Sequence, residues 1–166
     1  MSYTPMSDLG QQGLFDITRL LLQQPDLAAL SETLTRLVQQ SALADEAAII
    51  LWNAGNHRAA RYACDEAGHP VSYEDETVLA HGPVRRLLSR PDALHCDHET
   101  FADTWPQLIR SGLYRPFGYY SLLPLAADGR IFGGCEFLRR DNRPWSEKEF
   151  QRLHTFAQIV AVVTEQ

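Results

Sequence analysis

The sequence predicts an α+β fold built on antiparallel strands. Three observations favour this class. Two β-hairpin patterns occupy residues 46–64 and 119–139, segments with helical periodicity precede the first hairpin and follow the second, and the stretch between the hairpins is irregular. A chain of 166 residues suits one domain. We therefore expect a single domain over residues 1–166.

Two helices are expected ahead of the first hairpin. Apolar residues recur at helical spacing over residues 7–24, with Ser7 as the N-cap, and again over residues 27–41. Pro25 and Asp26 separate the two segments and end the first of them.

The two hairpins supply the longest strands. These strands are expected at residues 46–52, 57–64, 119–126 and 130–139. The first pair turns at residues 54–56 and the second at Asp128–Gly129, and Asp-Gly is a strong hairpin signal. Gly133 and Gly134 lie inside the last strand, where glycine indicates a bulge or a close approach of another group.

The middle of the chain is expected to hold shorter elements. Short strands are predicted at residues 71–73 and 93–96, and a helix in the second half of residues 77–89, with Pro83 in its first turn. A further helix over residues 99–109 should be perturbed at Trp105–Pro106, because proline removes a donor and crowds the preceding turn.

The last helix begins with a capping box and runs to the end of the chain. The Ser146 hydroxyl can accept from the amide of Glu149, whose carboxylate can reach back to the amide of Ser146. The apolar surface of this helix is wider than packing on one sheet requires. We therefore predict a homo-oligomer that forms through the terminal helices.

Charge and hydropathy exclude several classes of partner. The formal net charge is −6, and the cationic clusters Arg85–Arg86 and Arg139–Arg140 are short and offset by nearby acids. A nucleic-acid-binding domain needs a basic patch, so direct nucleic-acid binding is not expected. The apolar runs are far shorter than the ~20 residues that span a bilayer, and the N-terminus lacks the pattern of a secretory signal. We expect a cytoplasmic protein that binds no membrane.

The cysteines indicate neither a metal site nor a disulfide framework. Cys64, Cys96 and Cys135 are widely spaced and form no CxxC pair. Reduced, buried thiols are expected, because free cysteine packs as a small hydrophobe. His95 and His98 flank Cys96 closely, but three neighbours on an extended segment cannot all converge on one ion. No metal and no cofactor are predicted.

Two segments resemble the GAF domain family. From Tyr120 the chain has an apolar strand ending in Pro-Leu, a DG turn, a glycine-containing strand, and then an aromatic residue, a serine and a glutamate-rich helix start. From His81, HGPVRRLLSRPDALHCDHE looks like the family's middle segment. The resemblance covers about residues 9–165. It implies a central antiparallel sheet with the N- and C-terminal helices on one face and short helices over a ligand pocket on the other.

A closer resemblance concerns the opening segment MSYTPMSDLGQQGLFDITRLLLQQPDLAAL and the segment IFGGCEFLRRDNRPWSEKEF. Both are similar to the N-terminal region of formate-responsive, sigma-54-dependent transcriptional activators. Activators of that kind carry N-terminal GAF domains, a central AAA+ ATPase and a C-terminal helix-turn-helix. The resemblance implies that formate is the effector and that the chain is an N-terminal fragment. The chain itself has no GxxxxGK[ST] phosphate loop.

Formate is a small anion, so its affinity must come from charge-assisted donors. The resemblance places the ligand between the sheet and the middle segment. The candidates there are His81, Arg85, Trp105, Tyr114, Tyr119, Tyr120 and Cys135.

His81 and Arg85 are four residues apart, so a helix would place them one above the other. They could then bind an anion jointly with free amides near Gly82. The alternative is a solvated helix face with a capping histidine. Tyr119 and Tyr120 point to opposite sides of their strand. Cys135 is expected to pack, with Glu136 on the outer face.

Three functions compete at this point. The leading hypothesis is a ligand-sensing regulatory domain. The second is a ligand-free dimerisation or interaction module, which a pocket filled by the protein's own side chains would favour. The third is a GAF-type free methionine sulfoxide reductase, whose three cysteines cluster in the middle segment. Here Cys64, Cys96 and Cys135 lie 32 and 39 residues apart, so we predict that the chain is not an enzyme.

Overall fold

A six-stranded antiparallel sheet forms the centre of the computed structural model, which describes residues 11–53, 55 and 57–165. The strands lie in the order β3-β2-β1-β6-β5-β4. The elements are α1 (Gln11–Leu22), α2 (Leu27–Gln40), β1 (Glu46–Asn53), β2 (Arg58–Cys64), β3 (Pro70–Glu76), α3 (Thr77–Ala80), α4 (Pro83–Ser89), β4 (Leu94–Asp97), α5 (His98–Thr104), α6 (Pro106–Ser111), β5 (Tyr119–Ala127), β6 (Arg130–Arg139) and α7 (Glu147–Glu165).

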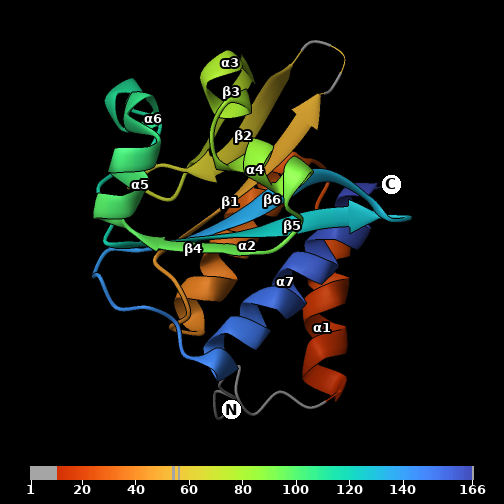
Figure 1. The fold of residues 1–166 in the computed structure, drawn as a ribbon. Coiled ribbons are helices and arrows are strands. Elements are labelled where there is room, and N and C mark those ends of the chain that lie inside the picture. The colour runs from red at the N-terminus through yellow and green to blue at the C-terminus, as the bar shows by residue number, and fades with distance from the viewer. Residues whose placement is uncertain (1–10, 54, 56, 166) are drawn as a thin grey trace.

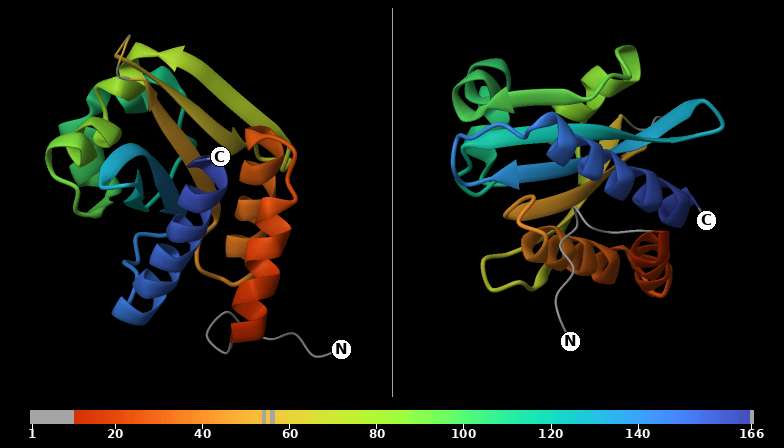
Figure 2. Two further views of the ribbon diagram at one scale, coloured as in Figure 1. Left: turned by 90° about the vertical axis from the view of Figure 1, so that its right-hand side faces the viewer. Right: turned by 90° about the horizontal axis from the view of Figure 1, so that it is seen from below.

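Helices cover both faces of the sheet. Helices α1, α2 and α7 lie on one face, with α1 and α7 side by side, and the short helices α3 to α6 lie on the other (Figures 1 and 2). This arrangement confirms the predicted fold class. Across the described residues, the structure has no helix with both the length and the hydropathy needed to cross a membrane.

Each face of the sheet has its own hydrophobic core. The long-helix core lies under α1, α2 and α7 and includes Leu34, Cys135, Phe137, Phe156 and Val160. The short-helix core lies under α3 to α6 and includes Ile50, Phe101, Leu108, Tyr120 and Leu122. Side chains alternate between the two cores along each central strand, because successive residues of a strand point to opposite faces.

The terminal helices pack more completely within the domain than the breadth of their apolar surface suggests. In α7 the buried residues are Leu153, Phe156, Ala157, Ile159, Val160 and Ala161. Among the described residues of the terminal helices, the large apolar side chains that stay exposed are Phe15, Leu20 and Leu22 of α1 and Val162 of α7. Oligomerisation through the terminal helices stays a prediction, and its candidate surface lies chiefly on α1.

Local sequence signals set most helix ends. Asp26 caps α2 by accepting a 2.8 Å hydrogen bond from the amide of Ala29. The capping box of α7 is confirmed: the Glu149 amide donates to Ser146 Oγ at 3.1 Å, and the Ser146 amide donates to Glu149 Oε1 at 3.0 Å. Ser7 and the turn residues 54 and 56 lie outside the described residues.

In the middle segment, helices and strands begin and end at other residues than expected. The helix expected at 99–109 is two helices, α5 and α6, that meet at Trp105, because Pro106 begins a new helix as its first residue. The strand expected at 71–73 extends over Pro70–Glu76, where pairing with β2 lengthens it.

The glycines of β6 act as predicted. An added Cβ on Gly133 would lie 2.1 Å from the carbonyl oxygen of Ile50, so β1 and β6 approach too closely for any side chain there. The register of β5 against β6 also shifts between Leu125 and Ala126, beside this glycine.

Candidate functional site

A fully buried carboxylate lies at the centre of the face covered by the short helices. Glu136 of β6 has no exposed surface. Its Oε1 accepts from Nε of Arg61 at 2.6 Å, and its Oε2 accepts from the hydroxyls of Tyr114, at 2.5 Å, and Tyr120. We call these four residues the Glu136 network. They come from β6, β2, the loop after α6, and β5.

Strand alternation and register bring the network together. Arg61 pairs with Ile50 of β1, and Glu136 pairs with Ala48 of the same strand. Ile50 and Ala48 are two residues apart and share a face, so Arg61 and Glu136 project to the same side of the sheet with β1 between them. The small Ala48 side chain leaves room for their long side chains to meet above it.

The buried Glu136 carboxylate favours the protonated forms of Arg61, Tyr114 and Tyr120. Burial by itself lowers the pKa of the Arg61 guanidinium, but the Glu136 carboxylate outweighs it, so the pKa is raised and Arg61 stays charged. Burial, reinforced by Glu136, raises the pKa of both Tyr114 and Tyr120. The two hydroxyls therefore stay protonated and donate to the carboxylate. The Arg61 guanidinium also lies over the Tyr114 ring, 4.3 Å from its centroid.

Aromatic rings close the network on the helix side. Phe101 of α5 packs with its ring centroid 4.7 Å from that of Tyr120 and 5.5 Å from that of Tyr114. Trp105, at the α5–α6 junction, packs on Phe101 at 5.2 Å. The space between the sheet and α5–α6 is thus occupied by the protein's own side chains at these positions.

The structure separates the residues that the sequence grouped as one site. Tyr114 and Tyr120 meet at Glu136, and Trp105 packs behind them. As expected from strand alternation, Tyr119 faces the other way, with its ring 5.8 Å from that of Trp145. His81 and Arg85 lie together but on the exposed surface, with Nδ1 and Nη1 2.8 Å apart.

Two expectations about β6 are wrong. Cys135 packs as expected, but it does so in the long-helix core and does not face the short helices, where a ligand residue would lie. Glu136 does not lie on the outer face; it is the buried centre of the network. The two residues are neighbours in a strand, so placing one of them on the wrong side necessarily misplaces the other.

The amides of Gly82 and Arg85 are both engaged within the chain. The amide of Gly82 donates to the carbonyl of Leu79, and the carbonyl of Gly82 accepts from the amide of Arg85. Pro83 has no N–H to offer. Gly82, Pro83 and Arg85 therefore offer no free backbone donor to an anion at the exposed His81–Arg85 pair.

Sequence reasoning missed Arg61 and the role of Glu136. A signal for Arg61 exists in β2, where the buried residues Ala59, Arg61 and Ala63 alternate with less buried ones. An arginine in phase with two buried alanines points to a buried charge that needs a partner.

A second group of charges lies at the end of the sheet near the network. Arg115 contacts Oε1 of Glu46 through Nε at 2.9 Å and through Nη2 at 2.5 Å. A pocket of about 100 Å³ lies beside this pair and is also lined by Arg61. A larger hollow of about 260 Å³ shares Arg115, Cys64 and Asp65 with it and opens between α2 and the β2–β3 loop.

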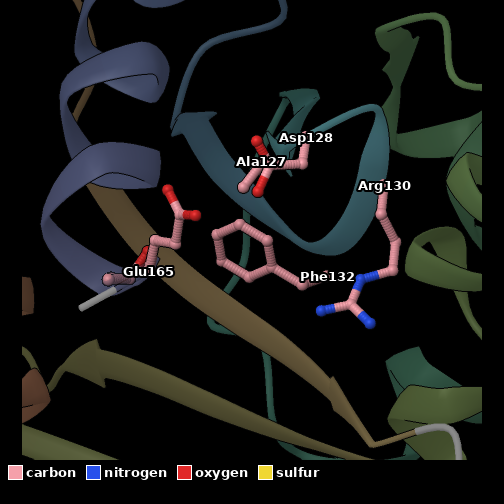
Figure 3. Close-up of a pocket in the computed structure, with 6 residues that line it drawn as sticks. Ala127, Asp128, Arg130, Phe132 and Glu165 are labelled. Carbon is pink, nitrogen blue, oxygen red and sulfur yellow. The ribbon is translucent and has the colours of Figure 1, made fainter.

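A third hollow lies at the opposite end of the sheet. It has a volume of about 440 Å³ and lies between the β5–β6 turn and the last turn of α7 (Figure 3). Phe132 and Glu165 face one another across it, Asp128 lies in the turn, and Arg130 follows the turn. The hollow contains one aromatic ring and has an open rim, and its polar groups do not converge on one point.

The cysteines are placed for packing. Cys64, Cys96 and Cys135 are all buried. Burial raises the pKa of each thiol, to about 11 for Cys96. A nucleophilic cysteine needs the opposite shift. Over the described part of the chain, no group of three or more His, Cys, Asp or Glu residues could hold a metal ion.

Comparison with known proteins identifies the family and its relatives. The family model described as the GAF domain matches residues 26–163. Two formate hydrogenlyase transcriptional activators, from Salmonella typhimurium strain SL1344 and Escherichia coli strain K12, are 74% and 71% identical to the chain over all 166 residues. The chain spans 24% of the length of each of these curated relatives. Both relatives are transcriptional activators.

Solved structures share the fold at low sequence identity. The GAF domain of the Acinetobacter phosphoenolpyruvate-protein phosphotransferase has a TM-score of 0.68 at 14% identity, covering 95% of each chain. The free methionine-R-sulfoxide reductase of Neisseria meningitidis has a TM-score of 0.64 at 13% identity, covering 99% of this chain and 93% of its own. These likenesses concern the fold alone.

Proposed function

The chain belongs to the GAF domain family, and we propose that it is the N-terminal regulatory domain of a sigma-54-dependent transcriptional activator that responds to formate. The observation that carries the proposal is the identity of 74% and 71% over all 166 residues with two formate hydrogenlyase transcriptional activators. The chain accounts for 24% of those proteins, and the proposal assigns the ATPase and DNA-binding activities of such an activator to regions beyond the match. The proposed setting is the cytoplasm, where transcriptional regulators act.

The charge of the chain is compatible with a regulatory rather than a DNA-binding role. A net charge of −6 disfavours phosphate contacts, so the domain would act on the rest of the activator. The ligand-sensing role rests on formate binding, which calls for a direct test.

The test is ligand-observed NMR or calorimetry on the 166-residue chain with sodium formate. Sodium acetate and sodium chloride at the same ionic strength are the controls. The proposal predicts saturable binding of formate and weaker or absent responses to the other two. Equal responses to all three salts would show that this domain does not select formate.

A ligand-free interaction module is the second candidate, and one observation favours it. The Glu136 network and Phe101 already occupy the space between sheet and short helices. The domain would then act through contacts with a second copy, for which α1 offers exposed Phe15 and Leu22, with Val162 of α7 also exposed.

Sedimentation over a concentration series tests this second candidate. A dimer that weakens in Leu22→Asp is expected, because burying an unpaired charge in an apolar interface is costly. Leu88→Asp is the matched control, since Leu88 is similarly exposed but lies on α4. A wild-type chain that stays monomeric at high concentration would exclude this surface as the dimer contact.

A further inference from the structure

We propose that the pocket between Arg61 and Arg115 is a binding site for a small carboxylate anion. The inference rests on the proposed function for the identity of that anion, which would be formate. It replaces the exposed His81–Arg85 pair as the expected position of the ligand. We call this pocket the two-arginine pocket.

The two-arginine pocket is built where four segments end together. The start of β1 contributes Glu46, β2 contributes Arg61 and Ala63, β3 contributes Val71 and Tyr73, and the loop after α6 contributes Gly112, Leu113 and Arg115. Cys64 and Asp65 complete the lining. The site is thus made from segments far apart in the sequence and lies on the face covered by the short helices.

Both arginines keep donors for a ligand. The protein contacts of Arg61 use Nε, toward Glu136, and Nη1, toward the carbonyl of Leu113 at 3.2 Å. Those of Arg115 use Nε and Nη2, both toward a single oxygen of Glu46. A guanidinium has five N–H groups. Each arginine therefore retains N–H groups beyond the contacts found within the described residues, and both arginines line the pocket.

Because Arg61 is buried, solvent screens its attraction for an anion only weakly. The Arg61 side chain is 5% exposed and the Arg115 side chain is 28% exposed. Guanidinium–carboxylate hydrogen bonds are charge-assisted and planar, so a carboxylate between two arginines can bond to both. The partial burial of this pair limits the screening of that interaction by salt.

The volume of the pocket restricts its ligand. It measures about 100 Å³, whereas sites for drug-sized ligands hold about 300–1,000 Å³. A one-carbon carboxylate fits this volume, and a nucleotide or a tetrapyrrole does not. Ala63 and Val71 in the lining offer no donors to a larger polar ligand.

Glu46 supplies an internal competitor for the ligand. Its carboxylate already holds Arg115, so an incoming anion has to share or displace that contact. Replacing Glu46 by a neutral isostere should therefore favour the ligand. The adjoining 260 Å³ hollow, which shares Arg115, Cys64 and Asp65 with the pocket, offers a route from solvent. Its rim carries Arg36 and Arg140 as well as the acids Glu32 and Glu66.

The experiment is a titration of sodium formate into the 166-residue chain and its variants at constant ionic strength. Arg115→Gln should weaken binding about ten- to hundredfold, since it removes charge-assisted hydrogen bonds. Glu46→Gln should tighten binding several-fold. Arg110→Gln, on the exposed surface of α6, is the matched control and should leave the affinity unchanged.

The opposite signs of the two variants separate a ligand effect from a loss of folding. A misfolded protein would lose affinity in both variants, so tighter binding in Glu46→Gln supports the site. Unchanged affinity in Glu46→Gln and Arg115→Gln, with a loss in Arg85→Gln, would overturn the two-arginine pocket and leave the proposed function intact. A wild-type chain that binds no formate would overturn both.

Discussion

Nε of Arg61 lies 2.6 Å from Oε1 of Glu136, with strand β1 between their two strands, and neither side chain is more than 5% exposed. Two tyrosine hydroxyls satisfy the other carboxylate oxygen. A buried ion pair of this kind contributes little net stability against an apolar replacement, yet removing one partner is costly. We therefore expect removal of one partner to destabilise the domain more than apolar replacement of both.

Removing the Glu136 carboxylate should strongly destabilise the fold. Glu136→Ala leaves the Arg61 charge buried without its partner, and we expect a loss of about 3–5 kcal/mol in the free energy of unfolding. Urea denaturation measures this loss. Glu66→Ala, in an exposed loop, is the control. The double variant Arg61→Met, Glu136→Leu removes the unpaired charge but leaves the Tyr114 and Tyr120 hydroxyls without their acceptor, so it should recover part of the loss. A double variant as unstable as the single one would contradict this account.

Removing the Tyr120 hydroxyl should lower the free energy of unfolding, and removing the Tyr119 hydroxyl should leave it nearly unchanged. Tyr120→Phe removes one donor from a buried carboxylate, which costs about 1.5–3 kcal/mol. Tyr119→Phe, on the opposite face of the same strand, should change stability by less than about 0.5 kcal/mol. The comparison uses urea midpoints of the two variants. Equal effects would mean that the hydrogen bond to Glu136 is not what stabilises Tyr120.

Any side chain at Gly133 should disrupt the pairing of β1 with β6. Gly133→Ala would place Cβ 2.1 Å from the carbonyl oxygen of Ile50, a backbone atom that cannot move alone. We expect a loss of about 3 kcal/mol or more, at the upper end of overpacking effects. Gly55→Ala is the control, because its Cβ would lie 3.3 Å from the flexible Asn53 side chain. Thermal melts compare the two, and a stable Gly133→Ala would show that the strands can separate locally.

The three thiols should be unreactive in the native protein. Burial raises the pKa of Cys64, Cys96 and Cys135, so little thiolate exists at pH 7.5. Alkylation by iodoacetamide should be slow until urea unfolds the domain, and Cys135, with no exposed surface, should react last. Mass spectrometry identifies the labelled sites. One cysteine that reacts faster than free cysteine would revive an enzymatic interpretation.

The capping box of α7 should give stability that depends on pH. Burial raises the pKa of Glu149, but the Ser146 amide and the Arg139 guanidinium outweigh it, so the pKa lies below its usual 4.5. A lowered folded-state pKa stabilises the fold above the unfolded value, and this contribution is lost as the pH falls through the folded value. Stability measured from pH 7 to pH 3 should therefore fall less steeply in Glu149→Gln than in the wild type.

The serine of the same box has a separate expected effect. Ser146→Ala removes the oxygen that accepts from the Glu149 amide, and N-cap losses are about 0.5–2 kcal/mol. Ser146→Asp should retain most of the stability, because aspartate is an equally good N-cap. Urea midpoints at pH 7 compare them, and equal destabilisation by both would show that the cap does not stabilise α7.

Local patterns predicted the scaffold because the interactions behind them are local. The Asp128–Gly129 turn, the Ser146 capping box, the first-turn Pro83 and the helix perturbation at Pro106 act on residues within a few positions. Those signals place hairpins and helix ends without reference to the rest of the chain. The same reasoning correctly separated Tyr119 from Tyr120, since alternation along a strand is local as well.

The candidate site depends on contacts between residues that are far apart in the sequence. Arg61 and Glu136 are 75 positions apart, and Arg115 meets Glu46 across 69 positions. No spacing in the sequence records such partners, because strand order and register bring them together. The phase of β6, which decides whether Cys135 or Glu136 faces the short helices, likewise depends on which core each side chain can join.

The sequence by itself therefore determined the α+β class, the two long hairpins, the capping box of α7 and the family. Tertiary structure alone decided that a buried carboxylate occupies the centre of the site, that His81 and Arg85 stay outside it, and that two distant arginines share a small pocket. The physical reason is that turns and caps are stabilised by neighbours along the chain. A buried charge is stabilised only by partners that the folded sheet delivers.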